Sequence, residues 1–378
     1  MIVDNRVVAA RVSFYSVPTE SFGERLPESD GTAIWDHTGV LLVELSAEGY
    51  VGLGYSYTSA AAGTIVKETL FPLLLGSDPM DTTATFWQMA QAVRNLGWPG
   101  ICANAISAID LALTDLKATI LDVPVVQLLG GGRTRVAAYG SGGFTNYTIP
   151  QLQEQLSGWA QSGLTAVKMK VGRQPDRDVD RVRAAREAIG PSVELFVDAN
   201  GAYTRKQALG LAHEFAEAGV SWLEEPVSSD DLEGLRLLRD RGPVGMQIAA
   251  GEYGYTPNYF HKMLAAGAVD ILQADATRCG GATGFLLAAA QAVSAALPLS
   301  AHTAPSVHAS LGSATSNTTN VEFFHDHARI EAMFFDGAAE PSQGWLEPDR
   351  SRPGLGLSFK RADATPYLVS TWTSDTGP

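Results

Sequence analysis

The stretch Ala166-Val167-Lys168-Met169-Lys170-Val171-Gly172 decides how the middle of the chain is interpreted. Successive side chains of a strand point to opposite faces, so Lys168 and Lys170 share one face of the strand predicted here. Val167, Met169 and Val171 fill the other face. Two unpaired lysines are too costly to bury in an ordinary core. The lysine face therefore indicates either a solvent-exposed edge or a functional site.

Polar residues end a series of similar apolar runs further along the chain. They are Asp198, Glu224, Glu252, Asp275, His302 and Glu322. Their spacing of roughly 20 to 30 residues is typical of the repeated strand-and-helix unit from which (β/α) barrels are built. Because the strand ends carry the chemistry in such barrels, these residues and the two lysines are candidates for one site.

The pattern from residue 135 to residue 324 predicts eight strands separated by seven helices. The strands are expected at 135–139, 166–171, 194–197, 221–223, 247–250, 269–273, 298–301 and 321–324. The helices are expected at 148–161, 176–189, 205–218, 231–240, 257–266, 281–296 and in a short stretch after Pro305. An open, doubly wound sheet has the same alternation, but eight units with polar residues at most strand ends favour a closed α/β barrel.

The residues before the barrel follow a different pattern. A strand is predicted at 7–15, a hairpin at 39–45 and 50–57, and helices at 64–74, 82–95 and 102–121. Sheet first and helices after indicates an α+β domain over residues 1–125, followed by the barrel over 126–335. Residues 16–36 are expected to form a long loop, and such loops are often lids or binding loops. The Gly- and Pro-rich residues 336–378 are expected to return to the first domain.

Composition limits the class of protein. The chain has 378 residues and a formal net charge of −14, which argues against nucleic acid or a membrane surface as a partner. An anionic small molecule stays compatible, because lysines and a bound cation reverse the local field. Cys102 and Cys279 lie far apart and form neither a disulfide framework nor a zinc spacing. Residues 1–6 lack a signal-peptide pattern, and the apolar stretch 70–75 is too short to span a bilayer, so we expect a cytoplasmic protein.

Asp198, Glu224 and Glu252 are carboxylates that end three successive strands. Side by side around one barrel mouth, three carboxylates repel one another. A divalent cation resolves this repulsion, and a set of oxygen ligands without cysteine or histidine suits a hard ion such as Mg²⁺. The alternative is that each residue is a helix N-cap or a surface charge, which explains one of them more easily than three at matched positions.

Basic groups flank this acidic set. Lys168 and Lys170 are suited to hold a substrate carboxylate and, in one case, to act as a general base. His302 after the seventh strand pairs with Asp275 after the sixth, which indicates a second base across the mouth from Lys170.

Five further groups near the mouth have weaker signals. Glu322 ends the eighth strand and is a candidate to hydrogen-bond a substrate or to act as an acid. Nothing in the sequence separates His308, His325 and His327 from surface histidines, and Asp326 among them is expected to be solvated.

Taken together, these motifs resemble those of the enolase superfamily, mandelate racemase subgroup. The motifs are Lys168-Met169-Lys170, Asp198-Ala199-Asn200-Gly201, Glu224-Glu225-Pro226, Gly251-Glu252, Asp275 and His302. Residues 105–117 and 128–131 resemble the linking helix and the barrel entry of the family, so the resemblance covers nearly the whole chain.

The resemblance implies a (β/α)₇β barrel of the TIM type, with an N-terminal α+β capping domain whose mobile loops set substrate specificity. It also implies Mg²⁺ held by Asp198, Glu224 and Glu252. A homo-oligomer, either a dimer or a larger ring, is usual in such families.

By position in the motifs, Lys170 would be one base and Lys168 its electrostatic partner. His302, oriented by Asp275, would be the base on the opposite face. Glu322 falls where the family often has an acid on the eighth strand. We also predict that Asn200 contacts the substrate.

The sequence departs from the family at two places. Tyr253-Gly254-Tyr255 follows the third carboxylate, where the namesake enzymes commonly have Asn, and the tract 304–308 after His302 also differs. Both departures concern the substrate pocket and leave the predicted metal ligands and bases intact, so they affect specificity more than chemistry.

The predicted chemistry is removal of a proton α to the carboxylate of a small molecule. This step places two negative charges on an enediolate, which Mg²⁺ and an adjacent lysine stabilise in sites of this superfamily. We expect a lyase that dehydrates an acid sugar. The first alternative is an isomerase, a racemase or epimerase of a hydroxy acid or amino-acid derivative. The second is a non-catalytic barrel that binds a metal and a ligand.

Overall fold

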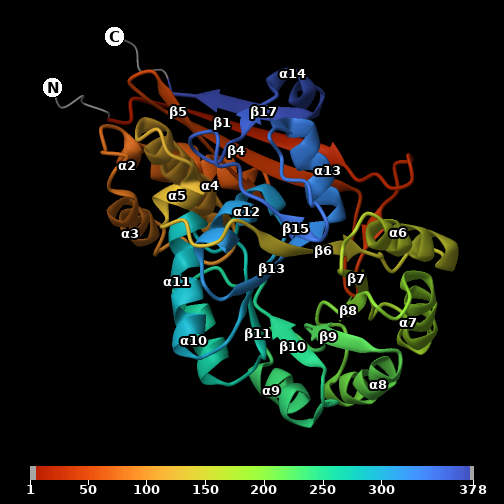
Figure 1. Ribbon diagram of the computed structural model, residues 1–378. Coiled ribbons are helices and arrows are strands. Elements are labelled where there is room, and N and C mark those ends of the chain that lie inside the picture. Colours follow the sequence, from red (N-terminus) through yellow and green to blue (C-terminus); the bar gives the residue numbers. More distant parts are fainter. Residues whose placement is uncertain (1–5, 375–378) are drawn as a thin grey trace.

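The computed structural model describes residues 6–374, with a strand-rich unit on one end of a parallel barrel (Figure 1). Residues 1–5, whose composition argued against a signal peptide, and the last four residues of the predicted C-terminal segment lie outside the described part. Both ends of the described chain lie in the strand-rich unit, where the C-terminal strand β17 (Leu368–Thr373) pairs antiparallel with β1 (Ala9–Pro18).

Eight parallel strands form the barrel, and the last of them pairs with the first. In order around the barrel they are β6 (Val136–Gly142), β7 (Ala166–Lys170), β8 (Glu194–Asp198), β9 (Val220–Glu224), β10 (Gln247–Ala250), β11 (Ile271–Ala274), β12 (Leu299–Ala301) and β13 (Thr318–Phe324). The predicted TIM-like barrel is therefore confirmed.

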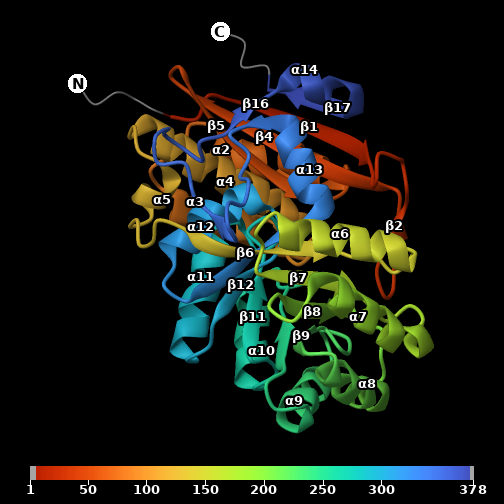
Figure 2. The same cartoon turned by 45° about the vertical axis from the view of Figure 1, so that its right-hand side comes forward.

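Seven helices connect these strands and surround the barrel in Figure 2. They are α6 (Ile149–Gln161), α7 (Pro175–Ile189), α8 (Arg205–Glu217), α9 (Leu232–Arg241), α10 (Pro257–Ala265), α11 (Gly281–Ser294) and α12 (Pro305–Ala314). The observed strands β6 and β13 are longer than predicted. β6 continues through Gly140, Ser141 and Gly142, whose small side chains give no apolar alternation for sequence analysis to detect.

Aromatic side chains close the barrel interior below the strand ends. Tyr139, Phe196, Trp222 and Ile271 form a small buried cluster there. The Phe196 and Trp222 rings stack with their centroids 4.9 Å apart. The Trp222 indole N–H donates to Glu224 Oε2 at 3.1 Å. A residue of this buried cluster therefore orients one of the predicted site carboxylates.

The capping unit is a four-stranded sheet in the order β17-β1-β4-β5, covered by helices on its barrel side (Figure 1). Its remaining elements are β4 (His37–Ala47), β5 (Tyr50–Tyr57), α1 (Ala61–Ile65), the π-helix η1 (Val66–Leu70), α2 (Phe71–Leu74), α3 (Thr82–Ala92), α4 (Ile101–Ile120) and α5 (Val125–Leu128). The predicted helix 64–74 contains a π-helical segment just before Pro72, which lacks the N–H of a regular turn.

The long helix α4 packs against β5 at very short range. A Cβ atom at Gly54 would lie 2.1 Å from the Ala108 carbonyl oxygen, and one at Gly52 would lie 2.2 Å from that of Ala112. Only glycine fits this approach, which explains a Gly-x-Gly pair that has no phosphate-binding role in the fold.

Residues 19–36 lie over the mouth of the barrel. They include the two-residue strands β2 (Glu28–Ser29) and β3 (Ile34–Trp35), which pair with each other. A Cβ atom at Gly31 would lie 2.3 Å from the carbonyl oxygen of Ala199, so this loop touches the end of β8. The Thr145 N–H, beyond β6, donates to the Ser29 carbonyl at 2.8 Å. The predicted loop is thus in contact with the strand ends that carry the candidate site.

The C-terminal elements join both parts of the molecule. They are α13 (His325–Phe334), β14 (Phe335–Asp336), β15 (Trp345–Leu346), β16 (Ser358–Phe359), α14 (Arg361–Ala364), the 3₁₀-helix η2 (Thr365–Tyr367) and β17. β15 pairs with β6 of the barrel, and β17 completes the capping sheet. Among residues 6–374, no helix is both long and apolar enough to cross a membrane.

Candidate active site

The three predicted metal-binding carboxylates meet at the barrel mouth. Asp198 ends β8, Glu224 ends β9, and Glu252 lies two residues after β10. One oxygen from each lies within 4.8 Å of the other two, and the residues are 0%, 0% and 4% exposed. This burial excludes the alternative in which each is an independent surface charge. Such a cluster of oxygen donors fits a hard divalent cation.

The balance of charge around these carboxylates also fits a cation. Six carboxyl groups gather at the mouth: Asp198, Glu224, Glu225, Glu252, Asp275 and Glu322. Four basic groups face them: Lys168, Lys170, Arg278 and His302. Burial, and then the neighbouring Asp198, raises the pKa of Glu224 to about 8, as expected for a buried carboxylate that lacks full compensation.

Both lysines of β7 point into this cluster. Lys168 Nζ lies 2.6 Å from Glu224 Oε1 and 2.8 Å from Glu322 Oε1, and Lys170 Nζ lies 2.5 Å from Asp198 Oδ2. Burial opposes the charge on each lysine, yet Glu224 and Asp198 outweigh it and raise both pKa values above their usual range. The lysine face of this strand was interpreted as either a solvent-exposed edge or a functional site, and the burial of both lysines excludes the exposed edge.

His302 lies on the other side of the carboxylates, after β12. Its Nδ1 is 2.9 Å from Asp275 Oδ2, and its Nε2 is 3.2 Å from Glu252 Oε2. Burial acts to lower the pKa of His302, but Glu252 and Glu322 raise it to about 9. Asp275 is itself held by Thr277, whose N–H and hydroxyl both donate to Oδ1 at 2.7 Å. The histidine is thus fixed in orientation through Asp275.

Glu322 connects the two halves of the site. Its Oε1 accepts hydrogen bonds from Lys168 and from the Ser141 hydroxyl, and its Oε2 accepts from the Thr303 N–H at 3.1 Å. The same Oε2 lies 3.6 Å from His302 Nε2. The sequence placed Glu322 at the end of the eighth strand but gave no sign of these partners.

The backbone after three of these strands is left-handed. Asn200, Glu225 and Thr303 have φ values of 46°, 38° and 52°. Such conformations are rare for non-glycine residues and gather at functional sites. Asn200 donates its N–H to Asp198 Oδ1 at 2.9 Å, while its side-chain Oδ1 is buried with no partner among the described residues.

Arg278 is a residue of the site that sequence analysis missed. Its guanidinium donates to the Glu252 carbonyl at 3.1 Å and lies 3.6 Å from Asp275 Oδ2. It also lies 5.5 Å from the centre of the Tyr253 ring. The only sequence signal is its place three residues after Asp275, which is too common to carry a prediction.

The expectation that Asp326 is solvated was wrong. Asp326 is fully buried and accepts hydrogen bonds from Thr38 of the capping unit and from Arg329. His308 is also buried, with Nε2 accepting from the Ala276 N–H and Nδ1 donating to the Thr303 carbonyl. His325 is half-buried and contacts the Glu20 carbonyl in the loop over the mouth. Asp326 and His325 contact the N-terminal part of the chain, and His308 connects the segments after β11 and β12, which a sequence without contacts does not reveal.

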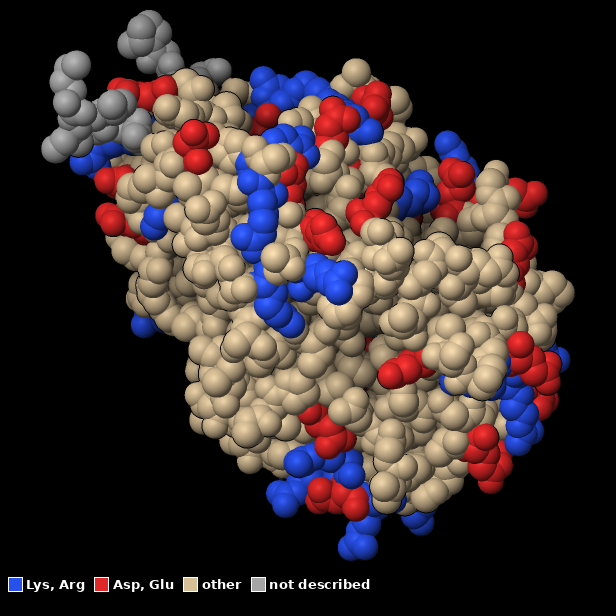
Figure 3. Space-filling model, in the orientation of Figure 1, with Lys and Arg blue, Asp and Glu red and all other residues tan. Residues whose placement is uncertain are grey.

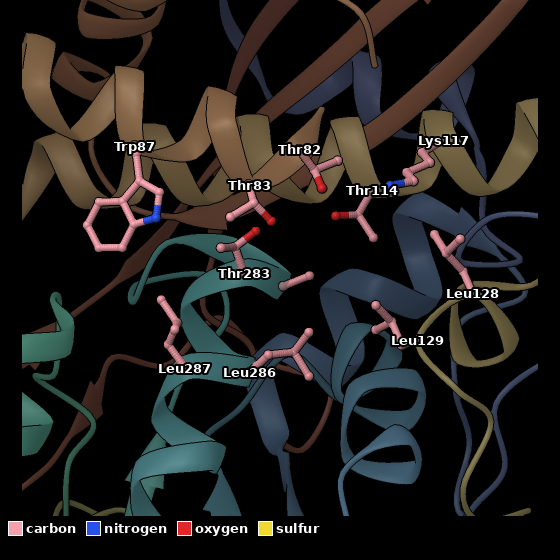
Figure 4. A pocket seen from close by; sticks show the side chains of 11 residues that line it. Thr82, Thr83, Trp87, Thr114, Lys117, Leu128, Leu129, Thr283, Leu286 and Leu287 are labelled. Carbon is pink, nitrogen blue, oxygen red and sulfur yellow. The ribbon is translucent and has the colours of Figure 1, made fainter. Parts of the chain in front are cut away.

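Two cavities do not include the charged residues of the candidate site. One, of about 340 Å³, lies between α3, α4 and α11 and is lined by threonine and leucine side chains with Trp87 and Lys117 (Figure 4). Another, of about 500 Å³, is lined by Tyr253, Tyr255 and Tyr259. The departure Tyr253-Gly254-Tyr255 therefore borders an open space next to Glu252.

The fold and the site define a class: a capped (β/α)₇β barrel whose mouth gathers three carboxylates, a lysine pair and a His–Asp pair. Comparison with known families agrees. Residues 29–130 match the mandelate racemase/muconate lactonizing enzyme N-terminal domain, and residues 151–364 match the enolase C-terminal domain-like family. The chain belongs to the mandelate racemase subgroup of the enolase superfamily.

Characterised relatives include two enzymes of acid sugars. The chain is 33% identical to 3,6-anhydro-α-L-galactonate cycloisomerase of Streptomyces coelicolor, over 93% of this chain and 97% of that enzyme. It is 32% identical to L-talarate/galactarate dehydratase of Salmonella typhimurium, over 85% of this chain and 80% of that enzyme.

Solved structures share the fold over its full length. A mandelate racemase/muconate lactonizing enzyme-like protein from Rubrobacter xylanophilus is 53% identical, with a TM-score of 0.92 over 96% of this chain and 100% of that one. A racemase from Streptomyces coelicolor with bound magnesium is 30% identical, with a TM-score of 0.89 over 96% and 100% of the two chains. Mg²⁺ is the cofactor of this family.

Proposed function

We propose that the protein is a Mg²⁺-dependent lyase that dehydrates an acid sugar. The observation that carries this proposal is the position of two basic side chains, Lys170 on β7 and His302 after β12, on either side of the carboxylate set. Asp198, Glu224 and Glu252 are the proposed metal ligands. Two bases around one metal-bound carboxylate allow one group to remove the α-proton while the other assists the leaving group.

In the proposed reaction Lys170 Nζ takes the proton from the carbon next to the substrate carboxylate. When bound, Mg²⁺ would stabilise the second negative charge that this step places on the substrate carboxylate. Lys168, with its charge held by Glu224 and Glu322, pairs with the same carboxylate. Asp198, which compensates the charge of Lys170 here, would hold the cation instead, and burial would then favour the neutral amine that a base requires.

The second half of the reaction uses His302. Its imidazolium, oriented by Asp275, gives its Nε2 proton to the departing β-hydroxyl. The C–O bond breaks, water leaves, and the resulting enol rearranges to an α-keto acid. Asn200, next to Asp198 with an unpartnered side-chain oxygen, is proposed to accept a hydrogen bond from the substrate.

A racemase or epimerase is the second candidate function. The same two bases would exchange the α-proton between the two faces of the carbon, and the 30% identical structure from Streptomyces coelicolor is described as a racemase. Solvent deuterium that enters recovered substrate with inversion, and without keto product, would assign this function. The acid-sugar enzymes among the relatives support dehydration instead.

A screen of mono- and diacid sugars with Mg²⁺ tests the proposal directly. We expect formation of an α-keto acid from at least one of them, with turnover lost when the metal is chelated. Tight binding of an acid sugar by calorimetry without any turnover or α-proton exchange across the library would instead indicate a non-catalytic ligand-binding barrel.

We also propose that the protein is a cytoplasmic homo-oligomer. Both cysteines are free and buried, as is usual in a reducing compartment. The part of the surface over α10 and α11 carries few charged side chains in Figure 3. Val293 on α11 is exposed to solvent. We expect light scattering to give a mass of at least twice the 40.1 kDa chain, and Val293→Glu to weaken the assembly. A monomer at all protein concentrations would contradict this proposal.

A further inference from the structure

His327 is a buried histidine that the proposed mechanism leaves without a role. It lies in the first turn of α13, is 7% exposed, and its Nδ1 has no hydrogen-bond partner among the described residues. An unpaired buried polar atom lowers the stability of the fold. A phenylalanine of similar shape would avoid this cost, so the imidazole needs a reason beyond packing.

The capping unit fixes the His327 ring. The Tyr57 ring of β5 lies parallel to it, with centroids 3.4 Å apart and an interplanar angle of 11°. Glu331, one turn further along α13, accepts hydrogen bonds from Tyr57 at 3.2 Å and from Tyr55 at 2.7 Å. Phe324 packs edge-on against the other side, at 5.1 Å. These contacts hold the ring in one orientation without using its Nδ1.

His327 also stands across the barrel from the metal ligands. Those ligands follow β8, β9 and β10, whereas His327 follows β13, which is separated from β9 by three strands in either direction around the closed barrel. A substrate whose carboxylate is bound at the ligands would have to extend across the mouth to reach His327. The atoms that reach His327 are therefore those beyond the reacting carbons.

The imidazole is neutral in this environment. Burial, opposed by Asp275 and reinforced by His302 and Arg278, lowers the pKa of His327 to about 3. A neutral imidazole offers one N–H donor and one lone pair, which match the acceptor and the donor of a hydroxyl group.

We propose that His327 recognises a hydroxyl group on the distal carbon chain of the acid sugar and thereby contributes to substrate specificity. This inference rests on the proposed dehydratase function. Because the ring is clamped by Tyr57, recognition requires the capping unit to be seated on the barrel. Sites built to hydrogen-bond a substrate hydroxyl discriminate strongly against analogues that lack it.

The test compares His327→Phe with the wild type on the acid sugar found by the screen and on its singly deoxygenated analogues. We expect kcat/KM for the parent sugar to fall ~10- to 100-fold, the range of one lost buried hydrogen bond. One distal deoxy analogue should show no further loss, because the group that His327 recognises is already absent. His213→Phe, an exposed substitution on α8, is the matched control.

His327→Asn and His327→Gln keep a polar atom near the Nδ1 and Nε2 positions, respectively, and cover the case in which the phenylalanine variant does not fold. We expect one of them to discriminate against the deoxy analogue like the wild type and the other not to. A change of less than twofold in His327→Phe, equal losses on every analogue, or equal discrimination by both amides would overturn the inference alone. A wild type that converts no acid sugar would overturn the proposed function, and the inference with it.

Discussion

Replacing Lys170 with alanine is expected to lower kcat for the acid sugar by ~10²- to 10⁴-fold, the usual contribution of a positioned general base. The ammonium group of Lys170 lies 2.5 Å from Asp198 at the centre of the site, and alanine leaves no group there to accept the α-proton. Steady-state turnover and α-proton exchange in deuterated solvent should fall together. A small primary amine added to the solution should restore part of both.

His302→Asn should separate the role of His302 in loss of the hydroxyl group from the role of Lys170 in removal of the α-proton. Asparagine keeps a hydrogen-bonding group near the position from which Nδ1 contacts Asp275 but supplies no proton for the leaving group. We expect dehydration to fall ~10²- to 10⁴-fold while Lys170 still exchanges the α-proton with solvent. Lys206→Ala, an exposed substitution on α8, serves as the control. If both Lys170→Ala and His302→Asn kept wild-type rates, the assignment of the two bases would be wrong.

The barrel was predictable because its signals are local and repeat. Each unit places an apolar run before a polar strand end and a helix after it, as in the run that ends with Asp198. Because polar residues recur at the ends of the predicted strands, the sequence alone predicted that Lys168, Glu224 and His302 belong to one site. The structure brings these residues together.

Contacts between distant segments could not be predicted in this way. Asp326 looked solvated because it stands among polar neighbours, but Thr38, far away in the chain, covers it. His327 had no distinguishing neighbour in sequence, since its partner Tyr57 belongs to the capping sheet. Arg278 acquires its meaning from the Glu252 carbonyl. In each case the decisive partner belongs to another strand or to the other part of the molecule, and single-sequence patterns carry no such pairing.

The proposed metal site has the largest expected effect on binding. Glu224→Gln replaces the central carboxylate of the three by a neutral amide of the same size, so one anionic ligand is lost and the mutual repulsion that a cation relieves is reduced. We expect Mg²⁺ affinity to fall by more than the ~10- to 100-fold typical of losing a hydrogen-bonding partner of a metal ligand. Calorimetric titration with Mg²⁺ measures this loss without any substrate.

Thermal unfolding gives an independent measure of the same site. A ligand that binds only the folded state stabilises it by about 2.7 kcal/mol at a hundred times its Kd, so Mg²⁺ should raise the Tm of the wild type. The rise should be absent in Glu224→Gln at the same Mg²⁺ concentration and present in Glu194→Gln, which changes an exposed glutamate at the opposite end of β8. Equal shifts in both variants would place the metal elsewhere. Lys168 contacts both Glu224 and Glu322. In Glu224→Gln the carboxylate of Glu322 still compensates the charge of Lys168, so we expect this lysine to stay buried and the variant to fold.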